Sequence, residues 1–314
     1  MASRSLPPRA IEVAVAVLLV TVIAIAFLVP RGAGDAASGP LVRPHPATAP
    51  FEGLGVWVDI YDAAAWADPP AAVADMVAHG VHTLYLQTSN ADRSTSIVFP
   101  DAVGSFLDAA REAGIAVVAW YLPHLTDPAT DRARALDAIG SSSPEGARFD
   151  GFALDIESGA VHDPARRSQR LVRLSREIRD EVGPGYPLGA VVPSPVRLRD
   201  DLAYWPAFPW HDLSLTYDAI LPMTYFTFRA HGPAASKAYV DDAIAEIRRG
   251  VGSDAVPIQV IGGLASDAST AETLAFVRAV RDAHVLGASW YSWPNVTAEQ
   301  WQALGRISNG ERTT

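Results

Sequence analysis

Short runs of apolar, β-prone residues alternate along most of the chain with longer stretches of helical periodicity. Eight such runs can be distinguished, over residues 53–61, 81–89, 115–124, 149–158, 186–194, 219–227, 257–265 and 288–294. Helical patterns fill most of the intervals, over residues 69–80, 100–114, 129–140, 165–183, 237–252 and 270–287. Runs that are apolar on both faces are typical of a parallel sheet covered by helices. Strand–helix alternation of this kind indicates βαβ units.

Eight β/α units within residues 51–307 predict the fold class α/β, and more narrowly a (β/α)₈ TIM barrel. A doubly wound open sheet is the alternative. The first predicted strand, residues 53–61, is followed by no Gly-rich phosphate loop, and the chain contains no Gly-x-x-x-x-Gly-Lys motif. We therefore favour the barrel, and we expect the polar residues 308–314 to form a disordered tail.

The N-terminal region has a different pattern. Residues 11–29 are almost entirely apolar and long enough to cross a bilayer as a helix, which predicts a transmembrane signal anchor. Arg4 and Arg9 precede this segment, so residues 1–10 are expected to stay in the cytoplasm. Residues 30–50 are rich in Pro, Ala and Gly and read as a linker. The sequence thus predicts a single-pass membrane protein with its barrel outside the cytoplasm; a secreted protein after signal cleavage is the alternative.

Composition excludes several classes of function. The formal net charge is -10, which argues against a nucleic-acid partner because phosphate binding needs a basic surface. The chain has 0 cysteines, so disulfides, thiolate metal sites and cysteine nucleophiles are excluded. Its 8 histidines show no metal-ligand spacing, and we expect neither a metal nor a cofactor.

In a (β/α)₈ barrel, functional residues lie at the C-terminal ends of the strands. Polar and aromatic residues gather at these ends: Asp59, Tyr61, Gln87, Tyr121, Asp155, Glu157, Tyr225, Trp290 and Trp293. Carboxyl groups for acid–base chemistry, amides for hydroxyl groups and flat rings for sugar faces together indicate a carbohydrate site. The partner we expect is therefore a polysaccharide or oligosaccharide.

Asp155 and Glu157 end the fourth strand, in "FDGFALDIES". Residues i and i+2 of a strand share a face, so both carboxyl groups are expected to point into the barrel mouth, about 6.5–7 Å apart along the chain. Ala153 shares that face, deeper in the barrel. Two close carboxyl groups resist double ionisation, which supplies a general acid near neutral pH. The alternative is a structural role in which Glu157 caps the next helix or pairs with Arg166 or Arg167.

The stretch "DGFALDIE", residues 150–157, resembles the D-G-x-D-x-D-x-E motif of family-18 glycoside hydrolases, the chitinase-like group. "MTYF", residues 223–226, is similar to that family's sixth-strand M-x-Y-D, and Trp290 or Trp293 to its eighth-strand tryptophan. The resemblance implies that Glu157 protonates the leaving oxygen and that Asp155 orients an acetamido group of the substrate. It also implies substrate contacts for Met223 and Tyr225.

The chain departs from this pattern at three places, which leaves a neutral sugar polymer, cleaved with a different nucleophile, as an alternative substrate. The family's third-strand S-x-G-G is absent, and "AWYLPH", residues 119–124, stands there. Ala153 stands where the motif has an inner Asp, and Phe226 stands where it has the Asp after the tyrosine. A weaker resemblance links "GVWVDIY" and "ALDIES" to family-25 lysozymes, which implies that Asp59 joins Glu157 in the site.

The sequence therefore predicts a glycoside hydrolase that acts on a cell-surface or environmental polysaccharide, with Glu157 as general acid. A non-catalytic, chitinase-like lectin barrel is the alternative, and a plain cell-envelope interaction domain is a third possibility. The aromatic loop around Trp205 and Phe208 is either a sugar-stacking platform or a hydrophobic plug.

Overall fold

A computed structural model describes residues 47–308. Eight parallel strands form one sheet in the order β6-β5-β4-β3-β2-β1-β8-β7. The strands are β1 (Gly53–Val58), β2 (Thr83–Asn90), β3 (Ala116–Leu122), β4 (Gly151–Asp155), β5 (Leu188–Val192), β6 (Ala219–Pro222), β7 (Gln259–Leu264) and β8 (Gly287–Tyr291). Parallel bridges of Ile220 with Ile258 and of Met223 with Ile261 join β6 to β7 and close the sheet into a barrel. The predicted (β/α)₈ barrel is confirmed.

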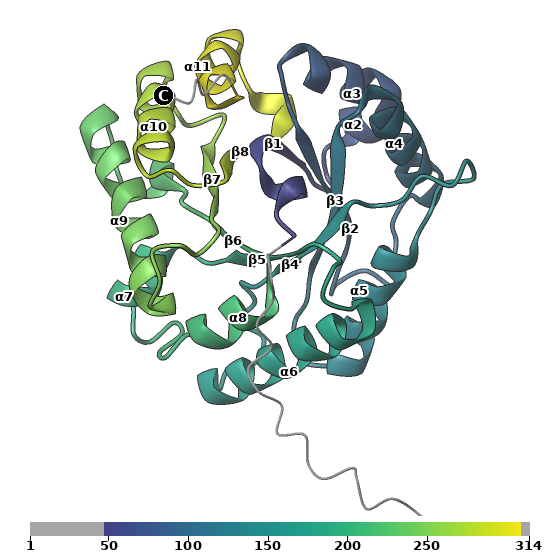
Figure 1. Ribbon diagram of the computed structural model, residues 1–314, viewed down its shortest axis with the longest axis horizontal. Coiled ribbons are helices and arrows are strands. Elements are labelled where there is room, and N and C mark those ends of the chain that lie inside the picture. Colours follow the sequence, from purple (N-terminus) through teal and green to yellow (C-terminus); the bar gives the residue numbers. More distant parts are fainter. Residues whose placement is uncertain (1–46, 309–314) are drawn as a thin grey trace, which may run out of the picture. The chain divides into compact units, whose positions relative to one another are not determined.

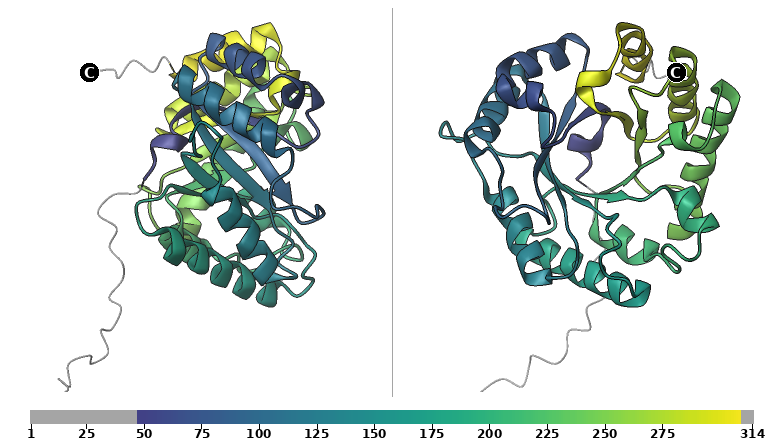
Figure 2. Two further views of the ribbon diagram at one scale, coloured as in Figure 1. Left: turned by 90° about the vertical axis from the view of Figure 1, so that its right-hand side faces the viewer. Right: turned by 180° about the vertical axis from the view of Figure 1, so that it is seen from behind.

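Helices surround the barrel as an outer ring (Figure 1), and the strands run through its centre in all views (Figure 2). The α-helices are α2 (Ala63–Ala67), α3 (Pro69–Ala78), α4 (Pro100–Ala113), α5 (Pro128–Gly140), α6 (Pro164–Val182), α7 (Pro195–Asp200), α8 (Trp210–Thr216), α9 (Pro233–Val251), α10 (Thr270–Asp282) and α11 (Ala298–Ser308). Short 3₁₀ turns are η1 (Ala49–Phe51), η2 (Phe226–Phe228) and η3 (Trp293–Asn295).

The predicted cytoplasmic tail, signal anchor, most of the linker and the C-terminal tail lie outside the described residues. Within residues 47–308, no helix combines the length and the apolarity that crossing a membrane requires.

Alternate strand residues build two apolar layers. Along β4, Phe152 and Leu154 pack outward against the helices, whereas Ala153 belongs to the barrel interior. Aromatic rings fill much of this interior: the Trp57 ring stacks on Tyr85 at 4.3 Å between centroids and meets the Trp120 ring edge-on at 5.6 Å. The interior is therefore a packed core and not a channel.

The N-terminal end of the barrel is plugged. Phe51 from η1 is 0% exposed and packs inside the barrel with Val191 and Leu221. Gly189 on β5 makes room for it, because a Cβ at that position would lie 2.9 Å from the Phe51 ring. With this end filled, a ligand can reach the barrel only from the C-terminal ends of the strands.

The segment between β5 and β6 contains two short helices that the apolar pattern did not predict. Helix α7 has only six residues, too few for a periodic signal. Its start does follow the rules for helix N-termini: the Ser194 side chain accepts a hydrogen bond from the Arg197 N–H, and Pro195 occupies the first turn. This helix places Arg197 beside the strand ends.

Candidate active site

Asp155 is the last residue of β4 and faces the barrel interior. Its side chain is 7% exposed, and its Oδ1 atom has no hydrogen-bond partner within the described part of the chain. Burial in the first place, and then the negative charge of Glu157, raise the pKa of Asp155 well above its usual value. The carboxyl group therefore holds a proton at a pH where an exposed aspartate has lost it.

Glu157 lies two residues further along the chain, beyond the end of the strand, and remains open to solvent. Loss of surrounding water raises the pKa of Glu157, and the guanidinium of Arg197 lowers it by a smaller amount. The two carboxyl groups form an interacting pair, so their protons are lost in steps that belong to the pair. Such a pair provides one proton donor next to an open cavity.

That cavity adjoins Glu157 at the C-terminal rim and has a volume of about 310 Å³. Its lining residues are Glu157, Pro193, Ser194, Arg197, Tyr204, Met223, Tyr225, Phe228, Arg229 and Tyr239. They come from the loops after β4, β5 and β6 and from α9. Flat rings, hydroxyl groups and two guanidinium groups thus surround one exposed carboxyl group.

Tyr225 and Met223, which the sequence resemblance implies as substrate contacts, both lie at this cavity. Met223 is 7% exposed in the barrel interior, and both residues line the cavity. Burial chiefly, with help from nearby Asp155, raises the pKa of Tyr225 well above its usual value. Its hydroxyl group is therefore a neutral hydrogen-bond donor.

Tyr291 and Asp59 form the opposite part of the mouth. The Tyr291 hydroxyl donates a hydrogen bond of 2.5 Å to Asp59 Oδ2, and the Tyr291 ring lies 6.1 Å from the ring of Tyr225. Asp59 Oδ1 accepts a second hydrogen bond from the Tyr61 N–H at 2.6 Å. Asp59 therefore lies in the mouth, but both carboxyl oxygens are already used within the chain.

Asp62 lies beside Asp59 and is a further acid that the sequence did not single out. Its Oδ2 accepts a hydrogen bond of 3.0 Å from the Asp59 N–H. Burial, which outweighs the hydrogen bond from Asp59, raises the pKa of Asp62 to about 6. Asp62, which immediately precedes α2, thus changes charge close to neutral pH.

Some predicted site residues do not lie in the mouth. Tyr121 points outward, is 0% exposed and donates to Asp131 Oδ1 at 2.6 Å. Trp290 is also 0% exposed and packs between the barrel and α10, with its ring 5.1 Å from that of Phe276. Trp293 contacts α3, where its Nε1 donates to Asp75 Oδ2 at 3.0 Å. The structure does not bring these three residues to the cavity.

Two more predicted contacts have other partners. Gln87 is 3% exposed, and its Oε1 accepts a hydrogen bond of 3.0 Å from the Ile60 N–H, so it holds the loop after β1. Tyr61 is 69% exposed on that loop, with the Arg93 guanidinium 5.4 Å above its ring. The Tyr61 side chain is accessible to a ligand, whereas the Gln87 side chain is hydrogen-bonded to the backbone of the loop after β1.

The aromatic loop after β5 is largely a hydrophobic plug. Trp205 is 1% exposed and Phe208 is 8% exposed, and both belong to the outer core. Tyr204 differs from them, because it lines the cavity and its hydroxyl donates to the Glu157 carbonyl at 2.9 Å. Tyr204 is thus the residue of this loop that reaches the cavity, and the Arg197 guanidinium lies 3.7 Å over its ring.

Strand alternation would have identified Tyr291. In β8, Ser289 shares a face with Tyr291, and Ser289 Oγ accepts a hydrogen bond from the buried Trp57 Nε1 in the barrel interior at 2.7 Å. Trp290 is on the other face. No such signal marked Arg197, which lies in the six-residue helix α7, or Tyr204 and Arg229, which lie in irregular segments. In none of these segments does a period fix the direction of the side chain.

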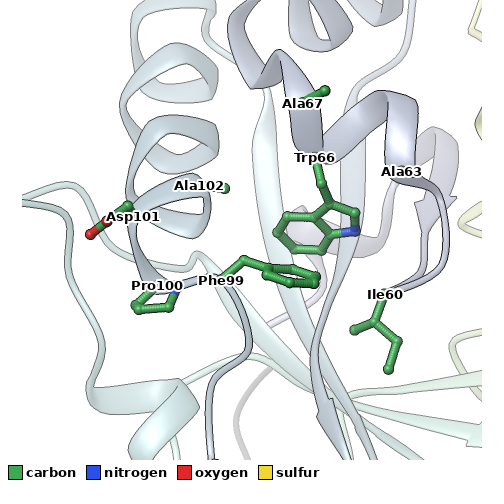
Figure 3. A pocket seen from close by; sticks show the side chains of 8 residues that line it. All are labelled: Ile60, Ala63, Trp66, Ala67, Phe99, Pro100, Asp101 and Ala102. Carbon is green, nitrogen blue, oxygen red and sulfur yellow. The ribbon is translucent and has the colours of Figure 1, made fainter.

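A second hollow, of about 490 Å³, lies over the loop after β1 and the start of α4 (Figure 3). Its floor is apolar: the Trp66 ring faces that of Phe99 at 5.2 Å, and Ile60 lies beside them. Asp101 at its edge points away from these rings (Figure 3). This hollow has no pair of acids aimed into it.

The described residues contain no cluster of three or more His, Cys, Asp or Glu side chains arranged to hold a metal ion. The arrangement around Glu157 is one of proton donors, hydrogen-bond donors and aromatic rings.

Several solved structures share this fold. An endo-β-1,4-mannanase from Thermotoga petrophila is 12% identical with a TM-score of 0.63, over 84% of this chain and 78% of that chain. The spore cortex-lytic enzyme of Bacillus cereus is 10% identical with a TM-score of 0.61, over 82% and 74%. A GH18 chitinase from Cycas revoluta, in complex with (GlcNAc)4, is 13% identical with a TM-score of 0.58, over 81% and 99%.

At these identities the similarity concerns the fold. The expected likeness to family-18 glycoside hydrolases is confirmed at that level, and mannanases share it equally. No protein-family model matches the chain, and no curated protein matches it.

Proposed function

We propose that this protein is a glycoside hydrolase that cleaves a polysaccharide with Glu157 as its general acid. The observation that carries the proposal is the interacting pair of Asp155 and Glu157 at the C-terminal rim, beside a cavity lined by aromatic rings. Barrel enzymes place their chemistry at this rim. The solved structures that share the fold, a mannanase, a chitinase and a cortex-lytic enzyme, support a glycan substrate.

Glu157 has the position that an acid catalyst needs. Its side chain reaches the open cavity, so a glycosidic oxygen can approach it, and partial burial favours its protonated form. Protonation of the leaving oxygen is the step that cleavage of a glycosidic bond requires. Asp155 lies deeper and is only 7% exposed, so it acts on the substrate or on Glu157 from below.

Tyr225 completes this arrangement. Its neutral hydroxyl can donate a hydrogen bond to a substituent of the sugar ring that lies above Asp155. The sequence resemblance implies that this substituent is an acetamido group. Ala153 leaves Asp155 without a deeper carboxyl partner, and the unpaired Oδ1 is consistent with that loss.

The test is release of reducing ends by the purified full-length chain from peptidoglycan, chitin oligomers, mannan and neutral glucans. We expect release from at least one polymer, and we expect Glu157→Gln to lower kcat/KM about 10²–10⁴-fold, the usual contribution of general acid–base catalysis. Glu112→Gln, at an exposed position in the last turn of α4, is the matched control and should leave the rate unchanged. Full activity of Glu157→Gln would show that another group is the acid.

A non-catalytic sugar-binding barrel is the second candidate, and the replacement of two motif acids by Ala153 and Phe226 favours it. Phe226 is 0% exposed and packs with Phe276 in the outer core, so that position has no catalytic group. Binding without release from any polymer, unaffected by Glu157→Gln, is the result this candidate predicts.

We further propose that the barrel works outside the cytoplasm, held by residues 11–29. Support comes from the apolar composition of that segment and the two arginines before it. Protease added to intact cells or spheroplasts should then degrade the barrel, while a cytoplasmic marker stays intact. Protection of the barrel until the cells are lysed would contradict this location.

A further inference from the structure

The cavity beside Glu157 contains two cationic side chains that the proposed cleavage reaction does not use. Arg197 comes from α7 and Arg229 follows η2, and both line the cavity together with Glu157. The chain as a whole is acidic, with 35 Asp and Glu residues against 25 Lys and Arg residues. This cavity, with two arginines and one glutamate among its lining residues, therefore has more cationic than anionic side chains, unlike the chain as a whole.

Neither guanidinium is closely paired with a carboxylate. Arg197 has only a loose contact, 3.8 Å from Nε to Asp201, between side chains that are 41% and 48% exposed. Arg229 makes no ion pair within residues 47–308. By contrast, Arg199 between them on the chain donates twice to Asp242, at 2.8 and 2.9 Å. Arg199, which does not line the cavity, is closely paired, whereas the two arginines that line the cavity have a loose ion pair at most within residues 47–308.

The Arg197 guanidinium is nevertheless held in place. It lies 3.7 Å from the centroid of the Tyr204 ring, and the Tyr204 hydroxyl donates to the Glu157 carbonyl at 2.9 Å. A stacked guanidinium keeps its edge N–H groups free for a planar anion. Tyr204 thus links the Arg197 guanidinium, which stacks on its ring, to Glu157, whose carbonyl accepts from its hydroxyl. These two contacts fix the position of the cation relative to the proposed acid.

A cation at this place opposes the acid function of Glu157, because it favours the ionised carboxylate. A neutral sugar would need no such group. We propose that Arg197 and Arg229 bind a carboxylate group on the sugar next to the cleaved bond, so that the substrate is an acidic glycan. The proposal rests on the function inferred above and specifies its substrate class.

Binding of a carboxylate has a consequence for the acid. The substrate's negative charge offsets the field of Arg197 at Glu157, so Glu157 keeps its proton more readily in the complex than in the free protein. The groups that face Glu157 from the surrounding elements are Asp155, Arg197, Tyr204, Tyr225, Arg229 and Tyr239. Among these, only the two arginines carry a positive charge.

The net charge of -10 does not oppose this assignment. Charges further than a Debye length, about 8 Å at physiological ionic strength, are largely screened. The two guanidinium groups are at the cavity itself, where charge-assisted, two-point hydrogen bonds to a carboxylate can form.

Binding of oligosaccharides to the full-length Glu157→Gln protein, measured by calorimetry, tests the inference without turnover. Two acidic probes cover the two sources of a sugar carboxylate: trigalacturonic acid, and a tetrasaccharide of alternating N-acetylglucosamine and N-acetylmuramic acid. Each is compared with its methyl ester, which keeps the ring and removes the charge. We expect at least one acid to bind about tenfold or more tightly than its ester, and the better acid identifies the source.

The arginine variants locate the interaction. Arg229→Gln and Arg197→Gln, each in the Glu157→Gln background, should reduce the preference for the acid about tenfold and leave ester binding nearly unchanged. Arg281→Gln, an exposed arginine in the last turn of α10, is the control and should keep the preference.

Equal binding of acid and ester, or equal loss of both in the arginine variants, would overturn the inference. If the wild-type protein at the same time released reducing ends from a neutral polymer, the glycoside hydrolase proposal would remain intact. The reverse result, acid-selective binding without release from any polymer, would support the acidic ligand and reject cleavage.

Discussion

Asp155 combines burial with an unpaired carboxyl oxygen, which is an arrangement that favours reactivity over stability. Its pKa is raised by burial and by Glu157, so the folded state binds its proton more tightly than the unfolded state does. The associated stability is therefore fully present below the unfolded pKa of about 3.9 and is lost as pH rises through the folded pKa. At neutral pH this residue destabilises the barrel.

Asp155→Asn removes the ionisable group at nearly constant shape. We expect the variant to be more stable than the wild type at pH 7, with Tm higher by about 2–4 °C for each 1 kcal/mol gained. The difference should shrink at pH 4, where the wild-type carboxyl is protonated as well. Calorimetric melts at both pH values check this, and a lower Tm at pH 7 would show that the charge of Asp155 is stabilised by a contact in the folded protein.

Tyr291 holds Asp59 in the mouth by a hydrogen bond to a carboxylate. Hydrogen bonds to charged groups contribute about 1.5–3 kcal/mol, so Tyr291→Phe should lower the free energy of unfolding by about that amount. Urea unfolding of Tyr291→Phe, Asp59→Asn and the double variant measures the coupling. Interacting groups give a double variant whose loss of stability differs from the sum of the two single losses. If the losses for Tyr291→Phe and Asp59→Asn add up to that of the double variant, the hydrogen bond between them contributes nothing to stability.

Helix α6 is tied to the strands by a buried ion pair. Arg179 Nη2 lies 2.6 Å from Asp218 Oδ2, with the two side chains 8% and 0% exposed, and Arg179 also donates to the carbonyls of Thr216, Gly183 and Tyr186. This pair lies at the N-terminal ends of β5 and β6, away from the cavity. It fixes how the helix is packed and has no part in the chemistry.

Arg179→Gln removes the cationic partner of the buried Asp218 carboxylate, which still accepts hydrogen bonds from the Ala47 and Leu188 N–H groups. Breaking a buried ion pair in this way costs about 3–5 kcal/mol of stability. Arg132→Gln is the matched control, since Arg132 pairs with Glu181 at 2.7 Å between exposed side chains and should cost about 1 kcal/mol or less. Urea unfolding gives both values, and activity per folded molecule should be unchanged in both. Equal costs would contradict a special place for the buried pair.

The two strands that carry most of the site show what the sequence could predict. In β4 the period of two correctly placed Ala153 and Asp155 on the face that points into the barrel, and Leu154 between them points outward, as strand geometry requires. In β8 the resemblance to a family with an eighth-strand tryptophan led to Trp290 as the predicted site residue. The alternation of the strand instead places Tyr291 in the mouth. Arg197 could not be placed in this way, since α7 is six residues long and its position depends on packing.

Under the proposed function, the N-terminal end of the barrel contributes stability and the C-terminal end binds the glycan, and one phenylalanine at each end tests this division. Phe51 is 0% exposed and fills the N-terminal end, so Phe51→Ala should create a cavity and lower the free energy of unfolding by about 3–5 kcal/mol. Phe228 is 63% exposed and lines the cavity, so Phe228→Ala should change stability by about 0.5 kcal/mol or less. Its effect should instead be on glycan affinity, because an aromatic ring at the cavity is lost.

Urea unfolding and oligosaccharide binding, measured on both variants, give a two-by-two comparison. Phe51→Ala should bind glycans like the wild type at temperatures where it is folded, since the plug is separated from Glu157 by the aromatic interior around Trp57 and Tyr85. A loss of affinity in Phe51→Ala would mean that the interior transmits the defect to the mouth. A large loss of stability in Phe228→Ala would mean that the exposed ring supports the rim, and the division between the two ends would then be wrong.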